Sequence, residues 1–294
     1  MRLFTSILFS IIYCACAHAR QRIPEAVIAD PPSNTKFPAR MEVLHIPSGG
    51  VEINGVVYVA SGAGPHPTFL LFHGLPGNEK NLDLAQAVRR AGWNAITINY
   101  RGSWGSPGNF RFAQELEDAA AVLSFIRVPE NARRLSIDVN RIALGGHSLG
   151  GWVAAETLAR DPNLLGGVLI CPADFGAVGL RGQQKRSEVV ALMNDNRESL
   201  AGVTGESMAD ELVSHAQEWS FSTLAPGLVH RQLFVLYSND FLKPDSIRLV
   251  DDIKIAGGTT CTSDYVDTDH SWSDHRIALE SLVINWLRSL PAHP

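Results

Sequence analysis

Residues 141–151 carry the feature that most limits how this chain can fold, an apolar run that leads into a glycine-rich turn. Its sequence is RIALGGHSLGG, in which Gly146, Ser148 and Gly150 form a G-x-S-x-G pattern. This pattern is typical of a nucleophile elbow, a sharp strand-to-helix turn that exposes a serine hydroxyl. A side chain at either glycine would collide with neighbouring backbone in so tight a turn. The stretch therefore predicts a buried strand, a turn at Ser148 and a helix that starts at Leu149.

Apolar runs and helical patterns alternate on both sides of this turn. Strands are expected at residues 41–46, 51–60, 68–72, 94–99, 141–145, 167–171, 232–237 and 259–266. Helices are expected at residues 81–91, 114–127, 149–160 and 245–256, and in a terminal segment whose apolar row is Ala278, Leu282, Trp286 and Leu290. Such alternation predicts an α/β fold with a mostly parallel eight-stranded sheet and helices on both faces.

Residues 174–229 interrupt the alternation. They contain no convincing strand, and helical patterns cover only residues 187–193 and 207–219. A compact domain rarely carries so much chain as plain loop. We therefore expect a helical cap insertion at about residues 174–229, over the carboxyl ends of the strands, where open α/β sheets bind ligands.

The N-terminal residues differ in composition from the rest of the 294-residue chain. Residues 1–19 combine Arg2, an apolar run and the small-x-small sequence AHA, as an export signal does. The run is too short and too polar for a typical membrane span. Residues 20–40 are rich in proline and predict an extended segment before a single domain at residues 41–294. We expect a secreted or periplasmic protein without stable membrane insertion.

The net charge of −5 comes without a basic stripe, which argues against a nucleic-acid partner. Removal of the signal would leave Cys171 and Cys261, and neither thiol has a convincing catalytic neighbour. We interpret both as small buried residues.

Three further segments resemble the α/β-hydrolase fold family. HGLPG at residues 73–77 is similar to the family's H-G-x-x-G loop, and DHSWS at residues 269–273 resembles its C-terminal histidine loop. NYRGSWG at residues 99–105 resembles a segment of prolyl-oligopeptidase-like hydrolase domains. No β-propeller precedes residue 41 in this sequence, so gating of the kind that a propeller provides is not implied. The family's strand order would also place a strand between Cys171 and Cys261, too far apart for a disulfide.

The chemistry of a serine nucleophile indicates its partners. A serine hydroxyl needs a base, and the base needs an acceptor to orient it. In this fold the order along the chain is serine, acid, histidine. Ser148 is the candidate nucleophile, with a small helix-capping serine as the alternative. Asp240 is the candidate acid and His270 the candidate base. Their competitors are Asp245, which suits the first turn of the next helix, and His275, expected about one turn into the terminal helix.

Backbone N–H groups of Leu75 and Leu149 are the candidate oxyanion-hole donors. Trp104 and Trp219 are candidate substrate-binding residues, although such aromatic side chains are as often core. A metal site would have to use the acids and histidines of residues 267–275, whose spacing fits no known helix-borne histidine pair. We expect neither metal nor cofactor.

Together these features predict an exported serine hydrolase that cleaves carboxylic esters through an acyl-enzyme. Its substrate is expected to be a small-molecule ester or a short peptide. One alternative is a prolyl-oligopeptidase-like peptidase or aminopeptidase. The other is a non-catalytic binding protein on the same fold.

Overall fold

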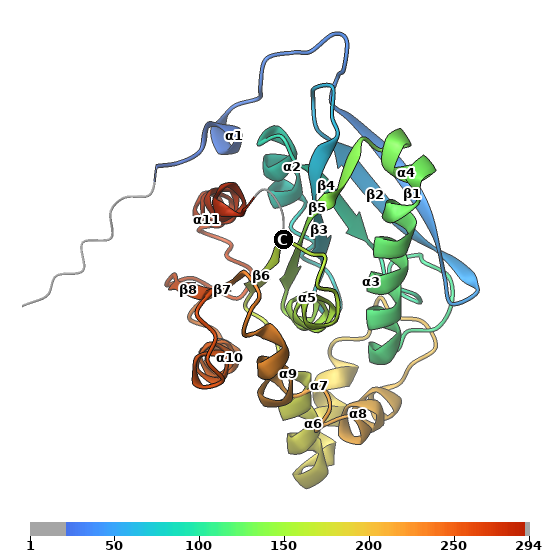
Figure 1. Ribbon diagram of the computed structural model, residues 1–294. Helices are drawn as coiled ribbons and strands as arrows, with labels where there is room; N and C mark the ends of the chain where they lie inside the picture. The colour runs from blue at the N-terminus through green and yellow to red at the C-terminus, as the bar shows by residue number, and fades with distance from the viewer. Residues whose placement is uncertain (1–21, 292–294) are drawn as a thin grey trace, which may run out of the picture.

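A mostly parallel eight-stranded sheet runs through the centre of the molecule (Figure 1), as the sequence predicts. The computed structural model describes residues 22–291. The strands are β1 (Arg40–Ser48), β2 (Val51–Val59), β3 (His66–Phe72), β4 (Asn94–Ile98), β5 (Ile137–His147), β6 (Gly166–Ile170), β7 (Leu233–Tyr237) and β8 (Cys261–Tyr265). Their order is β1-β2-β4-β3-β5-β6-β7-β8. Pairs β1–β2 and β2–β4 are antiparallel, and all other pairs are parallel.

The burial of the strands explains why their sequences are continuous apolar runs in the middle of the sheet. All residues of β4 and β6 are buried, because helices cover both faces of the sheet there. The edge strand β1 instead alternates between exposed and buried residues over its second half. Its hairpin with β2 turns at Gly49 and Gly50, which both have positive φ.

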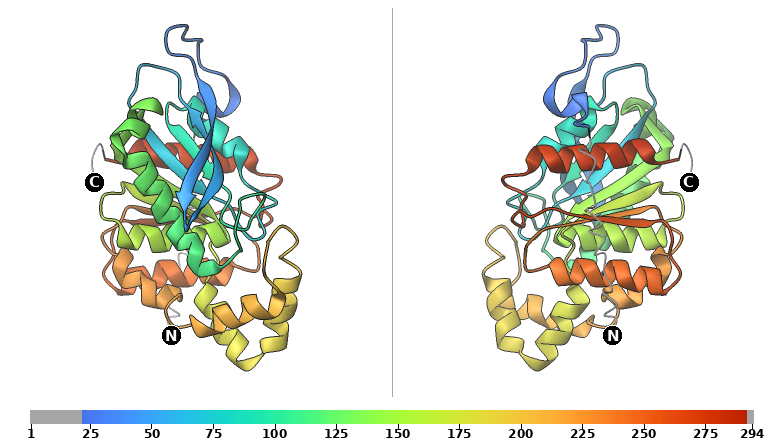
Figure 2. Two further views of the ribbon diagram at one scale, coloured as in Figure 1. Left: turned by 90° about the vertical axis from the view of Figure 1, so that its right-hand side faces the viewer. Right: turned by 90° about the vertical axis from the view of Figure 1, so that its left-hand side faces the viewer.

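Two layers of helices enclose the sheet. One face carries α2 (Leu82–Arg90) and α11 (Arg276–Ser289), with the short α1 (Glu25–Ile28) against them. The other face carries α3 (Phe112–Arg127), α5 (Leu149–Arg160) and α10 (Lys243–Ile255), and α4 (Pro129–Arg134) follows α3 directly. Figure 2 shows α11 lying along one side of the molecule.

The segment predicted as a cap contains four helices, of which α6 to α8 gather at one end of the molecule (Figure 2). They are α6 (Phe175–Gln184), α7 (Arg186–Asn194), α8 (Gly205–Ser214) and α9 (Phe221–Leu228). The sequence patterns missed α6 and α9, because glycines in α6 and Pro226 in α9 weaken their helical signal. Those glycines let α6 approach α8 closely: a Cβ at Gly179 would lie 2.1 Å from the Leu212 carbonyl oxygen.

The predicted export signal at residues 1–19 lies outside the described residues and stays a prediction. Within residues 22–291, no helix is both long and apolar enough to cross a membrane. Both cysteines of the described chain, Cys171 and Cys261, are free. They belong to opposite sides of β7, as expected, since Cys171 follows β6 and Cys261 begins β8.

Candidate active site

Ser148 lies at the sharp turn between β5 and α5. Its backbone has φ 57° and ψ −117°, a conformation that is costly for a residue with a side chain. The turn is possible because a Cβ at Gly146 would lie 1.8 Å from the Gly150 carbonyl oxygen, and a Cβ at Gly150 would lie 2.2 Å from that of Phe72. The backbone N–H of Ser148 donates to the Ile170 carbonyl at the end of β6 (2.9 Å). Glycine is therefore required at both positions, and β6 helps to hold the turn.

Asp240 and His270 meet above the carboxyl ends of β7 and β8. Asp240 follows β7, His270 follows β8, and His270 Nδ1 donates to Asp240 Oδ2 over 2.6 Å. Asp240 also accepts hydrogen bonds from the Ser238 hydroxyl (3.0 Å) and from the Leu242 N–H (2.9 Å). Burial alone would raise the pKa of Asp240, but its bond to His270 and the charge of that ring outweigh burial and hold the pKa below its usual value. The carboxylate is thus fully bonded and ionised.

Ser148 and His270 line one small cavity of about 140 Å³, together with Gly74, Leu75 and His147. Within residues 22–291, the Ser148 hydroxyl makes no hydrogen bond, so the contact between serine and histidine is not formed in this conformation. Such contacts are often long in unliganded sites and tighten when substrate binds. The structure therefore brings the serine and the histidine to one cavity and joins only the histidine and the aspartate by a hydrogen bond.

His147, the last residue of β5, contacts His270 in two ways. Its Nε2 donates to the His270 carbonyl oxygen (2.9 Å), and the two rings lie 4.6 Å apart. Burial, followed by the nearby charge of His270, lowers the pKa of His147 to about 3. The ring is therefore neutral, with its proton on Nε2. The sequence pattern gave no signal for this contact, because His147 occupies a variable position of G-x-S-x-G.

The loop after β3 carries Leu75, the first candidate oxyanion donor, on the wall of the same cavity. It approaches Ser148 so closely that a Cβ at Gly74 would lie 3.1 Å from the Ser148 Cβ. The second candidate donor, Leu149, begins α5, where N–H groups have no partner within the helix. Both residues therefore lie next to the serine.

The neighbouring His73 is a structural residue in this loop. It donates from Nδ1 to the Gly74 carbonyl (2.8 Å), and its ring lies 4.7 Å from Tyr100. Burial lowers the pKa of His73 to about 4, so it is neutral near pH 7. It orders the loop and does not act as a second base.

Two side chains from other segments hold the loop at Pro76. The Trp104 indole N–H donates to the Pro76 carbonyl (2.6 Å), and so does the Ser199 hydroxyl (3.1 Å). Trp104 is 38% exposed beside the cavity but does not line it. Ser199 lies between α7 and α8, so the segment predicted as a cap contacts the loop that carries Leu75.

Trp219 corrects an expectation. Its side chain is 1% exposed and packs against Trp152, with ring centroids 5.1 Å apart. It is part of the core beneath α6, so substrate cannot reach it in this conformation. Sequence alone could not tell that this tryptophan is buried in the core, because a tryptophan that lines a binding site gives the same apolar signal.

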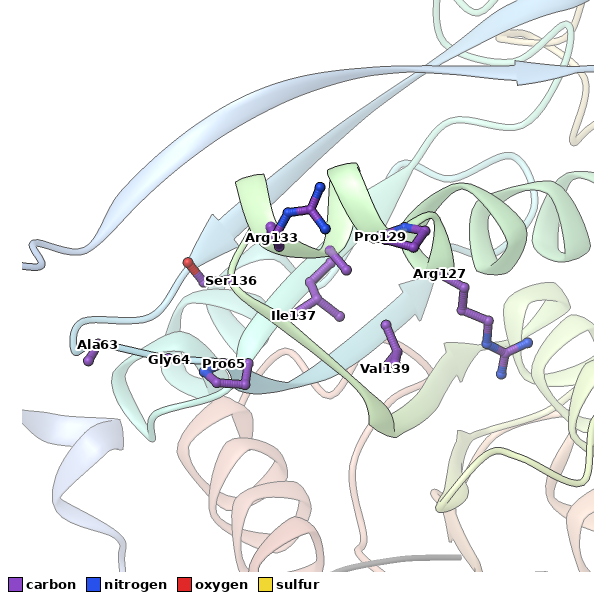
Figure 3. Close-up of a pocket in the computed structure, with 10 residues that line it drawn as sticks. Ala63, Gly64, Pro65, Arg127, Pro129, Arg133, Ser136, Ile137 and Val139 are labelled. Atoms are coloured by element: carbon purple, nitrogen blue, oxygen red, sulfur yellow. The ribbon is translucent and has the colours of Figure 1, made fainter.

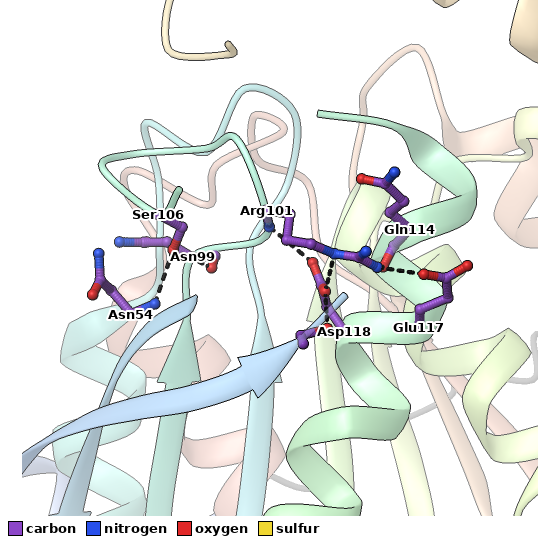
Figure 4. Close-up of polar contacts among 8 residues, drawn as sticks. Asn54, Asn99, Arg101, Ser106, Gln114, Glu117 and Asp118 are labelled. Atoms are coloured by element: carbon purple, nitrogen blue, oxygen red, sulfur yellow. Dashed lines mark hydrogen bonds and ion pairs between the residues drawn. The ribbon is translucent and has the colours of Figure 1, made fainter. Parts of the chain in front are cut away.

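The segment that resembles prolyl-oligopeptidase-like domains builds a buried network (Figure 4). Asp118 accepts from the Arg101 N–H (2.8 Å) and Nε (2.6 Å) and from the Ser48 hydroxyl (2.5 Å). The Arg101 Nη2 also contacts Glu117 (2.6 Å). The network ties the loop after β4 to α3 and lies outside the cavity that contains Ser148.

The competing residues lie elsewhere. Asp245 lies in the first turn of α10, as expected, and pairs with Arg248 (3.1 Å). Burial, with the nearby Asp174 as a second cause, raises its pKa to about 6. His275 precedes α11 as its N-cap and contacts Asp274 (2.8 Å), so the expected position one turn into the helix is wrong. Neither residue lines the cavity.

One group of metal-ligand atoms occurs in the described part of the chain, formed by Cys171, Asp240 and His270 within 4.8 Å of one another. Burial raises the pKa of the Cys171 thiol to about 12. Metal ligation by cysteine requires the thiolate, which this environment disfavours. These residues therefore fit a hydrogen-bonded cluster better than a metal centre.

A larger cavity of about 480 Å³ lies at the opposite end of β5 (Figure 3). It is lined by Ile137 and Val139 from the start of that strand and by residues of the α3–α4 corner, including Arg127 and Arg133. Ser148 follows the other end of the same strand. A strand of that length spans about 35 Å, so this cavity is separate from the serine.

Comparison with known proteins agrees with the fold. A family profile described as "Alpha/beta hydrolase family" matches residues 69–283. An esterase of Pyrobaculum calidifontis superposes with a TM-score of 0.62 at 20% identity, covering 86% of this chain and 87% of that chain. An acylaminoacyl peptidase of Pyrococcus horikoshii gives 0.66 at 16% identity, with 87% of this chain and 42% of that chain covered.

A third solved structure, a 2,6-dihydroxy-pseudo-oxynicotine hydrolase, gives a TM-score of 0.64 at 17% identity. It covers 87% of this chain and 69% of that chain. At these identities the superpositions establish the fold alone. The profile match extends from β3 to α11 and includes the serine turn and both of the loops that follow β7 and β8. The chain therefore belongs to the alpha/beta hydrolase family.

Proposed function

We propose that this protein is a serine hydrolase that cleaves carboxylic esters through an acyl-enzyme. The observation that carries the proposal is the 2.6 Å bond between His270 and Asp240 beside the cavity that Ser148 lines. Nδ1 of His270 is committed to Asp240, which leaves Nε2 as the nitrogen that can accept a proton from the serine.

The reaction starts when the Ser148 oxygen attacks the acyl carbon of an ester. His270 takes the hydroxyl proton as the new bond forms and then gives it to the departing alcohol. The Leu75 and Leu149 N–H groups stabilise the negative oxygen of the tetrahedral intermediate, a contribution of about 3 kcal/mol for each donor in such sites. Water then attacks the acyl-enzyme as His270 takes its proton, and His270 returns that proton to the Ser148 oxygen as the acid is released. Asp240 stays ionised and keeps the imidazole oriented throughout.

Ester cleavage is favoured over amide cleavage because an alcohol needs less help from a proton donor to leave. The esterase of Pyrobaculum calidifontis supports the same choice, since it and this chain match over most of both lengths. The peptidase of Pyrococcus horikoshii supports a second candidate, an acyl-peptide or aminoacyl hydrolase. This chain spans less than half of that peptidase, so any features in the rest of it do not transfer.

A screen of p-nitrophenyl esters of varied acyl length and of aminoacyl arylamides tests the proposal. We expect ester turnover and labelling by a fluorophosphonate probe, both abolished in Ser148→Ala. Loss of activity in His270→Ala, with activity kept in the matched control His275→Ala, would assign the base. Arylamide turnover without ester turnover would favour the peptidase. Absence of both labelling and turnover in the folded protein would leave a binding protein and contradict the proposal.

A further inference from the structure

We propose that Trp272, Cys171 and Ser238 form a one-way hydrogen-bond relay that fixes Asp240 and, through it, the imidazole of His270. The three are positioning residues, since none of them lines the cavity that contains Ser148. The inference rests on the proposed function, in which Asp240 orients the base. It concerns residues for which the sequence patterns assign no catalytic role.

The relay is continuous in space although its members come from three separate loops. The Trp272 indole Nε1 lies 3.3 Å from Cys171 Sγ, and Cys171 Sγ lies 3.3 Å from Ser238 Oγ. Ser238 Oγ lies 3.0 Å from Asp240 Oδ2, the same oxygen that accepts the His270 Nδ1 proton. Trp272, Cys171 and Ser238 are each fully buried, so water does not compete for these bonds.

The chemistry at the two ends fixes the direction of every hydrogen in between. An indole N–H can only donate, and a carboxylate can only accept. Ser238 must therefore give its single hydroxyl proton to Asp240 and accept from the Cys171 thiol. Cys171 in turn gives its proton to Ser238 and accepts from Trp272. All three donors point towards Asp240.

This direction requires that Cys171 stays a thiol. Burial, followed by the negative charge of Asp240, raises the pKa of Cys171 to about 12. The proton is then present across the range in which hydrolysis would be measured. Cys171 is a hydrogen-bonding link here and has no nucleophilic role.

The backbone gives an independent indication that these positions are specialised. Cys171 has φ 45° and Trp272 has φ 58°, in the left-handed region that non-glycine residues seldom adopt. Strained residues of this kind cluster at functional sites, because the surrounding structure holds them in place for a purpose. Ser148, with φ 57°, is a third such residue of the same site.

The relay matters because it determines what holds Asp240. Without Ser238, Oδ2 would lose its hydroxyl donor and keep His270, with the Cys171 thiol nearby, while the Leu242 N–H would still bind Oδ1. The carboxylate could then rotate, and His270 with it. A loosely oriented base lowers the rate of the chemical step more than it lowers substrate binding.

Steady-state kinetics on an ester substrate test the relay with five variants. Ser238→Ala should lower kcat about ten- to hundredfold, the effect of losing one hydrogen bond to a charged group, with KM within about threefold. Cys171→Ala should lower kcat less, and Trp272→Phe least, because each acts through the next. Cys171→Ser keeps a donor and an acceptor and should recover most of the loss. The matched control is Cys261→Ala, which removes the other free cysteine and should leave kcat unchanged.

Coupling between the variants separates a relay from ordinary packing. The double variant Ser238→Ala/Cys171→Ala should be no slower than Ser238→Ala alone, because the relay runs from Cys171 to Asp240 through Ser238. If the two substitutions caused independent packing defects, their losses of kcat would instead add. Equal kcat values for wild type, Ser238→Ala and Cys171→Ala would overturn the proposal, as would additive losses in the double variant. If Ser238→Ala fails to fold, the comparison of Cys171→Ala with Cys171→Ser carries the same test.

A measurement without substrate keeps this test apart from that of the proposed function. The proton between His270 Nδ1 and Asp240 should give a low-field NMR signal that broadens or shifts in Ser238→Ala and persists unchanged in Cys261→Ala. An inert wild type that fails to react with a fluorophosphonate would contradict the proposed hydrolase, whatever the NMR result. A reactive wild type with an unchanged signal in Ser238→Ala would contradict the relay alone.

Discussion

Asp118 and Asp240 are both buried aspartates that accept three hydrogen bonds, yet their surroundings suit them to different tasks. Asp118 faces the Arg101 guanidinium, which keeps its charge at any practical pH and is itself almost fully buried. Asp240 faces the His270 imidazole, which can exist as a neutral or a charged ring and is 24% exposed on a cavity. The comparison indicates that the partner, rather than burial, decides whether a buried carboxylate stabilises the fold or supports chemistry.

The largest expected effect is on the catalytic side of this comparison. Asp240→Asn should lower kcat about ten-thousandfold, because an amide in place of the carboxylate favours the wrong imidazole tautomer. The melting temperature should change much less than it does when Asp118 is replaced by asparagine. Ester kinetics and thermal unfolding of the same preparation measure both. Asp245→Asn serves as control and should keep wild-type kcat; a loss there as large as in Asp240→Asn would transfer the acid to Asp245.

Asp118→Asn should show the reverse pattern. Removing the charge leaves Arg101 buried without its main partner, which costs about 3–5 kcal/mol of unfolding free energy. Below the melting transition, kcat should stay within about tenfold of wild type, since the network lies outside the cavity. Urea unfolding gives the free energy, and Glu117→Gln, which changes an exposed partner of the same arginine, should cost under about 1 kcal/mol. A large loss of kcat in Asp118→Asn with unchanged stability would contradict the contrast drawn between Asp118 and Asp240.

Glu156, on α5, is a third buried carboxyl that extends the comparison. One of its oxygens pairs with the exposed Arg160, and the other has no hydrogen-bond partner among the described residues. Burial raises its pKa to about 7, although Arg160 opposes the shift. Because the folded pKa is raised, the stabilising contribution of the protonated form is complete below the unfolded value of about 4.3 and is lost as pH rises through about 7.

Glu156→Gln is neutral at every pH, so it should raise the melting temperature by about 2–6 °C at pH 8 and change it little at pH 5. Thermal unfolding across pH 5 to 8 measures the difference. An equal gain at both pH values would mean that packing, rather than ionisation, explains the effect. Glu188→Gln, on an exposed side chain of α7, is the control and should show no pH dependence beyond wild type.

The sequence predicted the residues whose positions follow from chain order. Ser148 is marked by its glycines, and Asp240 and His270 each follow a strand whose apolar run is readable. Side-chain contacts between distant loops were not predictable in the same way. Ser238, Cys171 and Trp272 look like ordinary small or apolar residues, and no local pattern indicates that three separate loops bring them into contact or that Cys171 and Trp272 have positive φ. The prediction that Trp219 binds substrate was wrong, because an apolar sequence does not show whether a side chain faces the core or the binding site.

The double anchoring of the Pro76 carbonyl has a consequence for anyone who alters this enzyme's selectivity. One of its two donors, Ser199, belongs to the stretch between α7 and α8, the natural target for swapping or randomising when a new substrate is wanted. Replacing that stretch would also release the loop that carries Leu75, the proposed oxyanion-hole residue. Libraries that keep Ser199 and Trp104 constant should therefore retain turnover more often than libraries that vary the whole insertion.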